Sequence, residues 1–208
     1  FLVPKNGNDL KDVLRKYEAY GGLAVSSFFF GSNGHAKRPV EGQIASYTMR
    51  THPTNFSGNT LVKSIVQPAR VYLPNSPHDF TYQESFFCVN ESCLRVDGQH
   101  FPSYTMEIQL NHYFCRSLEE ISAKLRRGNS GNVTWARQRF DAVNQQSVCA
   151  DTTILSVLDK RLRQLEPGGG DAQPLLERLV AAAGPLRAAS LTLEIPAAVS
   201  LRPEIDAL

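Results

Sequence analysis

The sequence predicts an α/β fold with a mixed sheet and flanking helices, and three segments carry that prediction. Residues 23–30, LAVSSFFF, form a mostly apolar run of the kind found in buried strands. Residues 108–114, IQLNHYF, alternate in the manner of a strand. Ser117 then opens a segment with strong helix signals. At 208 residues, the chain is long enough for one globular domain and a tail.

A helix is expected ahead of the first of these strands, in the segment NGNDLKDVLRKYEAYGG. Asn8 or Asp9 would cap its start, and Gly21–Gly22 would end it. After the strand comes GSNGH, whose two glycines permit positive φ angles and a close approach of the backbone to a ligand. This loop, residues 31–35, is therefore expected to border a site.

The middle of the chain predicts short strands and loops. Residues 43–50, QIASYTMR, alternate like a strand. Residues 61–73 predict a strand pair or a bent strand interrupted at Pro68, because proline cannot donate a ladder hydrogen bond. Residues 74–80, PNSPHDF, predict a loop.

The later elements are predicted by periodicity and capping. Ile108, Leu110, His112 and Phe114 share one strand face. Ser117 and Glu120 form a capping box, and further helices are expected over residues 134–144 and 152–164. After residue 165 the composition shifts to Ala, Leu, Pro and Gly. Residues 1–165 are thus expected to form the domain and residues 166–208 a linker and an Ala/Leu/Pro-rich tail.

Three Asn-x-Ser/Thr sequons, at Asn55, Asn90 and Asn132, favour a secretory compartment. Cys88 and Cys93 bracket the second sequon. The pair is either a disulfide that closes a short glycosylated loop or two free thiols near a hairpin, and the spacing leaves both open.

Composition excludes several classes of partner. A net charge of +2 is too small to predict a nucleic-acid or anionic-membrane partner. No apolar run approaches the roughly 20 residues of a membrane span. His112 and the cysteines match no standard zinc spacing. Four arginines that could suggest nucleic acid are instead expected on a solvated surface: Arg126, Arg127, Arg137 and Arg139.

His112 and Arg116 lie where the predicted strand meets the predicted helix. A helix N-terminus offers free N–H groups to phosphate, and Arg116 would add a cation beside them. His112 could supply a metal ligand, so the two residues together would suit a metal-bridged diphosphate. A lone histidine on an apolar face is, however, more often a core residue.

Four segments resemble the glycosyltransferase family 92 domain in order and spacing: residues 1–35, KSIVQP, PHDF and NHYFCRSLEEISAKLRRG. The resemblance covers residues 1–151 and is most specific at FGSNGH and HYFCRSLEE. It implies the C-terminal portion of a GT-A type, Rossmann-like fold that transfers a hexose such as galactose from a nucleotide sugar to a glycan. It also implies a type II membrane protein of the Golgi lumen, anchored upstream.

Members of this family carry an Asp-x-Asp-Glu-Phe stretch that holds Mn²⁺ or Mg²⁺. This chain has no Asp-x-Asp, and Phe1 aligns with the phenylalanine of that stretch. The metal site is therefore expected to be incomplete and the chain alone inactive and only marginally stable. The alternative is a paralogue that binds carbohydrate or serves as structure without catalysis.

The resemblance also implies roles for individual residues. His112 would be the metal ligand, and Arg116 with Ser117 would hold the donor diphosphate. The loop Gly31, Ser32, Asn33 and Gly34 would line the cleft between donor and acceptor. The catalytic base stays open among His35, Asp79 and Glu84.

Overall fold

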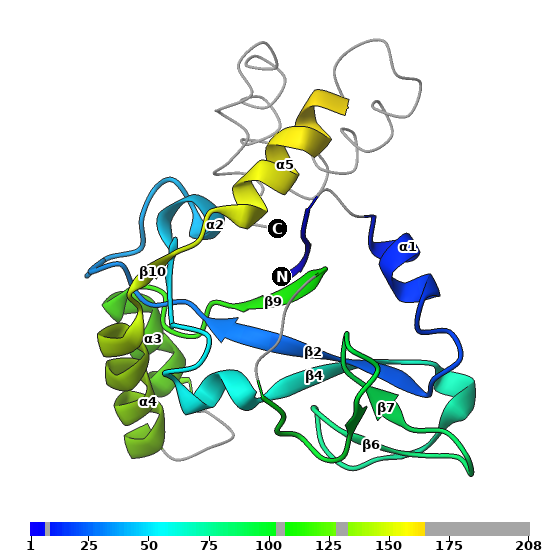
Figure 1. Cartoon of the computed structure of the whole chain (residues 1–208). Coiled ribbons are helices and arrows are strands. Elements are labelled where there is room, and N and C mark those ends of the chain that lie inside the picture. Colours follow the sequence, from blue (N-terminus) through cyan, green and yellow to red (C-terminus); the bar gives the residue numbers. More distant parts are fainter. Residues whose placement is uncertain (7–8, 103–106, 128–132, 165–208) are drawn as a thin grey trace.

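The computed structural model describes residues 1–6, 9–102, 107–127 and 133–164. These residues form a mixed α/β fold in which helices flank a mixed sheet (Figure 1), as the sequence predicts. The predicted linker and tail, residues 166–208, lie outside the described residues.

Six strands make up the main sheet. They are β1 (Leu2–Pro4), β2 (Gly22–Phe29), β4 (Val62–Val66), β7 (Cys88–Val89), β8 (Arg95–Val96) and β9 (Ile108–His112). The order is β1-β9-β2-β7-β8, and β4 also pairs with β2. Strand β2 runs parallel to β9 and β7 and antiparallel to β4. The sheet is therefore mixed, with β2 at its centre.

Strand β2 is buried along its whole length, which explains its nearly unbroken apolar sequence. Its odd-numbered residues Leu23 and Val25 pack in one cluster with Val13 of the first helix. Ala24 faces the other way, toward Val62 and neighbouring side chains. The period of two in strand geometry thus divides the core into two layers, one on each face of the sheet.

Five helices surround the sheet: α1 (Leu10–Arg15), α2 (Gln43–Ser46), α3 (Leu118–Arg126), α4 (Val133–Gln146) and α5 (Thr153–Gln164). Helices α3 and α4 lie side by side and share an apolar cluster with Phe29 (Figure 1). Helices α2 and α5 meet at Val3 of β1. Among the described residues, none of the helices has the length and apolar character needed to traverse a lipid bilayer.

The predicted start of α3 is confirmed in full. Ser117 accepts a hydrogen bond from the Glu120 N–H, and the Glu120 carboxylate accepts one from the Ser117 N–H. This reciprocal capping box satisfies two amides that a helix start otherwise leaves free. The helices expected over residues 134–144 and 152–164 are also present, as α4 and α5.

Two predictions in the first half of the chain are wrong in detail. Asp9 caps α1 as expected, but the helix ends at Arg15, well before Gly21–Gly22. Gly21 is required by packing instead, because a Cβ there would clash with the Tyr82 ring. Residues 43–50 form the short helix α2 and the two-residue strand β3 (Met49–Arg50) rather than one strand.

The remaining short elements agree with the predicted bend at Pro68. They are η1 (Ser57–Thr60), η2 (Pro68–Arg70), β5 (Val71–Pro74), β6 (Phe80–Tyr82) and β10 (Cys149–Ala150). Strand β5 pairs with β6, and β10 pairs with β3. The loop predicted at residues 74–80 joins β5 to β6 and brings β6 beside the main sheet.

A buried polar network ties the N-terminus of α5 to the sheet. The Asp151 carboxylate accepts hydrogen bonds from Arg50 Nε at 2.6 Å and from Gln109 Nε2 at 3.1 Å. Its other oxygen accepts from the Thr153 N–H at 3.0 Å, which caps α5. Asp151 is only 6% exposed, so this network joins residues far apart in sequence in a site of low solvent access.

Candidate functional site

His112 ends β9, level with Phe29 at the end of β2. Its imidazole packs against the Phe29 ring, with 4.4 Å between ring centres, and lies edge-on to Phe114 at 6.0 Å. The two parallel strands therefore deliver the histidine to the point where both strands end, a common place for functional residues in α/β proteins. Among the described residues, the imidazole nitrogens make no hydrogen bond.

His112 is neutral at physiological pH. Burial is the largest cause that lowers its pKa to about 4, and the positive charges of Lys124, Arg139, Lys63 and the Phe1 ammonium group contribute to the same shift. A neutral imidazole has a free lone pair and no proton to lose before it binds a cation. The environment thus suits both a metal ligand and a core residue.

Two cations from neighbouring helices converge on the same aromatic cluster. The Arg139 guanidinium of α4 lies 4.6 Å from the centre of the Phe29 ring, and the Lys124 ammonium of α3 lies 5.0 Å from that of Phe114. Burial lowers the pKa of both side chains. His112, Lys124 and Arg139 thus meet around Phe29 and Phe114.

This cationic cluster is not neutralised within the described part of the chain. Neither Lys124 nor Arg139 forms a salt bridge with a described carboxylate, and the Arg139 Nε is buried without a hydrogen-bond partner. Trp135, which is 50% exposed, lies beside Arg139 at 5.5 Å and connects the cluster with solvent. Partly buried cations without a counter-charge favour an anionic ligand.

The prediction that Arg139 lies on a solvated surface is wrong. Of the four arginines in that group, Arg126, Arg127 and Arg137 are exposed, whereas Arg139 is half-buried against three aromatic rings. The pattern held a signal for Arg139, because it lies three residues after Ala136 and four before Val143, on the buried stripe of α4.

The start of β1 lies close to this cluster. The Phe1 ammonium group donates to the Asn111 carbonyl at 2.9 Å, and β1 runs antiparallel to β9. A residue joined ahead of Phe1 would consequently continue along β9 at the level of His112. Within the described residues there is no cluster of three His, Cys, Asp or Glu side chains that would hold a metal.

The helix start at Arg116 and Ser117 differs from a free phosphate cradle. The N–H groups of Leu118 and Glu119 donate to the carbonyl groups of His35 and Ala36, at 3.1 and 3.0 Å. The Glu120 N–H donates to Ser117 Oγ. A diphosphate at this position would have to displace these acceptors, so the helix start does not present the open amides that the sequence suggested.

Arg116 itself is held in an uncommon backbone conformation, with φ at 49°. Its guanidinium lies 3.5 Å from the Glu120 carboxylate, and the Arg116 side chain as a whole is 40% exposed. The adjoining cavity is about 30 Å³, which has room for about one or two water molecules and is far too small for a diphosphate. Arg116 thus borders the corner without facing a ligand-sized space.

The predicted cleft loop packs between α3 and α4. Gly31 is buried where a Cβ would lie 2.6 Å from Ser147 Oγ, and the Ser32 N–H donates to Asn144 at 2.6 Å. Asn33 and Gly34 are exposed and both have positive φ, whereas Gly31, the other glycine of the loop, does not. The loop therefore covers the start of α3, and its exposed tip is two residues long.

The structure does not bring the three candidate bases together. The His35 ring lies 3.3 Å from the Ser46 carbonyl beside α2. Glu84 is exposed in the turn after β6. Asp79 lines a separate cavity with Ser64 and Cys88, which pair with Ala24 and Gly22 on β2.

Ala24 and Gly22 lie five and seven residues before Phe29 on β2, which corresponds to about 16 and 23 Å along the strand. The cavity of Asp79 is therefore centred toward the opposite end of β2 from His112.

Both cysteines of the possible disulfide are free thiols. Cys88 is buried in β7, and its thiol lies 3.8 Å from Ser64 Oγ, whereas Cys93 is exposed. Of the two alternatives, a disulfide or two free thiols near a hairpin, the structure contains the free thiols.

The sequons differ in access. Asn55 is exposed, but Asn90 is 6% exposed, and its side-chain oxygen accepts hydrogen bonds from the N–H groups of Ser92 and Leu94. Asn132 lies outside the described residues. Asn90 therefore holds its own turn together rather than facing solvent.

We expect folded protein secreted from eukaryotic cells to carry a glycan at Asn55 and none at Asn90, because a glycan at Asn90 is incompatible with the buried turn. Mass spectrometry before and after glycosidase treatment checks this in single Asn→Gln variants at the three sequons. A mass shift that Asn90→Gln removes and Asn55→Gln leaves unchanged contradicts the expectation. The absence of any shift counts against a secretory location.

No protein-family model matches the chain, and neither a curated protein nor a solved structure matches it.

Proposed function

We propose that this chain supplies the donor-diphosphate portion of a nucleotide-sugar-dependent glycosyltransferase, the C-terminal part of a GT-A type fold. One observation carries the proposal. Lys124 and Arg139 are partly buried beside a neutral His112, and no described carboxylate forms a salt bridge with either cation. A diphosphate supplies the missing negative charge, and the exposed Trp135 offers a flat surface at the entrance.

In this proposal the two cations act on the leaving group. When the bond between the sugar and the diphosphate breaks, negative charge grows on the departing diphosphate oxygen. Lys124 and Arg139 stabilise that charge from fixed positions, because helices α3 and α4 and the aromatic rings hold them in place. Their effect is strengthened by burial, which reduces solvent screening.

The described residues do not by themselves make up a site for Mn²⁺ or Mg²⁺. These hard cations take mainly oxygen ligands, and His112 offers a single nitrogen with no carboxylate cluster beside it. His112 fits one position of such a site only if carboxylates come from elsewhere. Carboxylates that precede Phe1 would meet His112 there, because Phe1 lies beside Asn111 of the neighbouring strand β9.

Binding of uridine diphosphate and adenosine diphosphate to the Arg139→Met variant tests the proposal. We expect a Kd about 30-fold weaker than in the unaltered chain, because one charge-assisted contact to the diphosphate is lost. Methionine keeps the apolar part of the side chain against Phe29. Isothermal titration calorimetry at low salt measures the effect.

Arg137→Met is the matched control, since Arg137 lies on the same helix but is exposed. Its Kd is expected to stay within about twofold of the unaltered chain. Equal losses of diphosphate affinity in Arg139→Met and Arg137→Met would show that only the overall positive charge matters, and not a specific contact with Arg139. Absence of diphosphate binding by the unaltered chain sinks the proposal.

A second candidate, a carbohydrate-binding protein without catalysis, is favoured by a different observation. The cavity lined by Asp79 combines aromatic rings with fixed polar groups, far from His112 along β2.

A further inference from the structure

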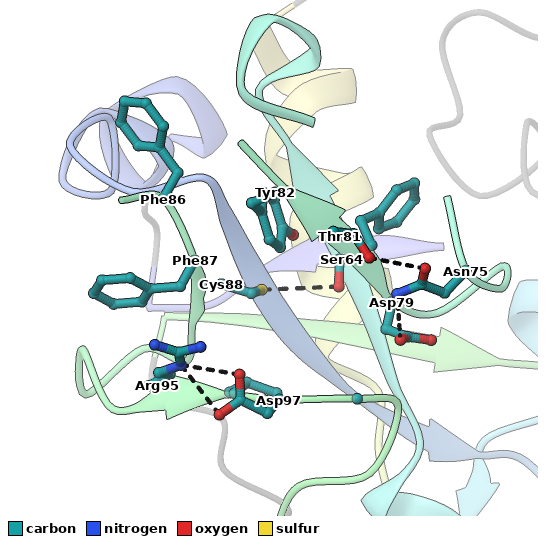
Figure 2. Close-up of a pocket in the computed structure, with 13 residues that line it drawn as sticks. Ser64, Asn75, Asp79, Thr81, Tyr82, Phe86, Phe87, Cys88, Arg95 and Asp97 are labelled. Carbon is teal, nitrogen blue, oxygen red and sulfur yellow. Dashed lines mark hydrogen bonds and ion pairs between the residues drawn. The ribbon is translucent and has the colours of Figure 1, made fainter. Parts of the chain in front are cut away.

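A cavity of about 320 Å³ lies between the β5–β6 pair and the β7–β8 pair (Figure 2). Its volume is at the lower end of the range for small-molecule sites, enough for one or two rings. Four aromatic side chains contribute to its walls: Phe80, Tyr82, Phe86 and Phe87. Polar side chains line the rest: Ser64, Asn75, Asp79, Thr81, Arg95 and Asp97.

The polar groups are fixed before any ligand arrives. Asp79 accepts hydrogen bonds from Ser76 Oγ at 2.6 Å and Asn75 Nδ2 at 3.2 Å, and these bonds lower its pKa, so the carboxylate stays ionised. Thr81 Oγ1 donates to the Asn75 side chain at 3.0 Å. A carboxylate that is already oriented binds a hydroxyl group with little loss of conformational entropy.

One polar group in the wall is poorly satisfied. The Tyr82 hydroxyl is buried with the Cys88 thiol and Ser64 Oγ as its polar neighbours, and it makes no well-aligned hydrogen bond to a described residue. Figure 2 shows it directed toward the side of the cavity where Ser64 lies. A buried hydroxyl with only such weak contacts is poorly satisfied, and a ligand hydroxyl in the cavity would give it a better partner.

The charges in the cavity select against anions. Arg95 forms a two-bond ion pair with Asp97, at 2.9 and 3.1 Å, so its charge is already matched. Asp79 then leaves the lining with one net negative charge, from two aspartates and one arginine. A phosphate or carboxylate ligand would be repelled, whereas a neutral ligand with many hydroxyl groups would not.

We propose that this cavity binds one neutral sugar residue of hexose size. Its hydroxyl groups bond with Asp79 and Tyr82, and an apolar face of its ring packs on the aromatic wall near Phe86. The sugar is either a free monosaccharide or the terminal residue of a glycan. This site is separate from His112, Lys124 and Arg139, and the inference does not rest on the proposed transferase activity.

The test uses the full chain and NMR titration with methyl β-galactoside, methyl β-glucoside and N-acetylglucosamine. Tyr82→Phe is expected to weaken the Kd for the bound sugar about fivefold, because it removes one hydrogen bond to the ligand. The melting temperature should change little, since the ring remains and only weak contacts of the hydroxyl with Cys88 and Ser64 are lost. Phe86→Ala, which alters an exposed ring, is expected to weaken the Kd about threefold.

Tyr72→Phe is the matched control, because Tyr72 is 76% exposed on β5 and lies outside the cavity lining. His112→Leu separates the two sites and should leave sugar binding unchanged. A galactose-terminated glycan titrated in parallel distinguishes the sources: tighter binding than the methyl glycoside indicates a glycan terminus, and equal binding indicates a free sugar.

Three results overturn the inference. They are no binding of any of the sugars, equal affinity in Tyr82→Phe, Phe86→Ala and the unaltered chain, and loss of sugar binding in His112→Leu alone. Tighter binding of tetramethylammonium than of the sugars also overturns it, because the cavity would then select for positive charge.

Discussion

Replacing Asp151 with asparagine is expected to lower the free energy of unfolding by about 3 kcal/mol. The substitution keeps the size and shape of the side chain, so no cavity forms. It removes the charge that Arg50 pairs with, and it turns an NH₂ group toward donors that need an acceptor. The loss arises from the buried guanidinium left without its partner.

The ion pair between Asp151 and Arg50 also makes the free energy of unfolding depend on pH. Burial alone would raise the pKa of Asp151, but hydrogen bonds from Gln109, Arg50 and Thr153 outweigh it and hold the pKa below its usual value. A carboxyl group with a lower pKa in the folded state stabilises that state above its unfolded pKa of about 3.9. This stabilisation disappears as the pH falls below that value toward the folded pKa.

Urea denaturation of the unaltered chain and of Asp151→Asn, from neutral pH down to pH 3, measures both effects. The difference in unfolding free energy should be full near pH 7 and shrink in acid. Asp141→Asn is the control, since Asp141 is exposed on α4 and should change stability by less than about 0.5 kcal/mol. A small difference at pH 7, or one that grows in acid, refutes the structural role given to Asp151.

Elements with strong local signals were predictable from the sequence. The capping box at Ser117 and the apolar run of β2 are local properties, and the structure contains both. Residues 43–50 were not predictable in the same way. Ile44 and Tyr47 are both buried and lie three residues apart, a helical spacing that competes with the alternation. Ile44 packs against Val3 and Ile154, so distant residues decide its conformation.

The candidate site was predicted in part. His112 was identified from its place before a helix start, but its cationic neighbours come from two helices whose contact depends on tertiary packing. The amides at the start of α3 were expected to be open, and their acceptors lie about 80 residues earlier in the chain, at His35 and Ala36. A single sequence does not report such a contact.

His112→Leu is expected to weaken Mn²⁺ binding at least about 100-fold in a chain in which Asp-x-Asp-Glu precedes Phe1, whether natural or added. Loss of partners that only support a metal ligand costs 10- to 100-fold in affinity, and the loss of a ligand itself costs more. We expect the added carboxylates to lie near His112, because β1 runs antiparallel to β9 and Phe1 bonds to Asn111. Leucine preserves the packing between Phe29 and Phe114, so the fold should be retained.

Electron paramagnetic resonance of free Mn²⁺ measures the affinity, and thermal melts check the fold. His100→Leu, at an exposed histidine, is the control and should bind Mn²⁺ as the unaltered chain does. If His112→Leu binds Mn²⁺ equally well, His112 is a core residue that burial keeps neutral, and the cationic cluster of Lys124 and Arg139 would have to hold a diphosphate without it. If only His112→Leu loses the metal, His112 is a ligand of that metal, and Lys124 and Arg139, which lie against the same aromatic rings, would be close enough to hold a diphosphate that the metal bridges.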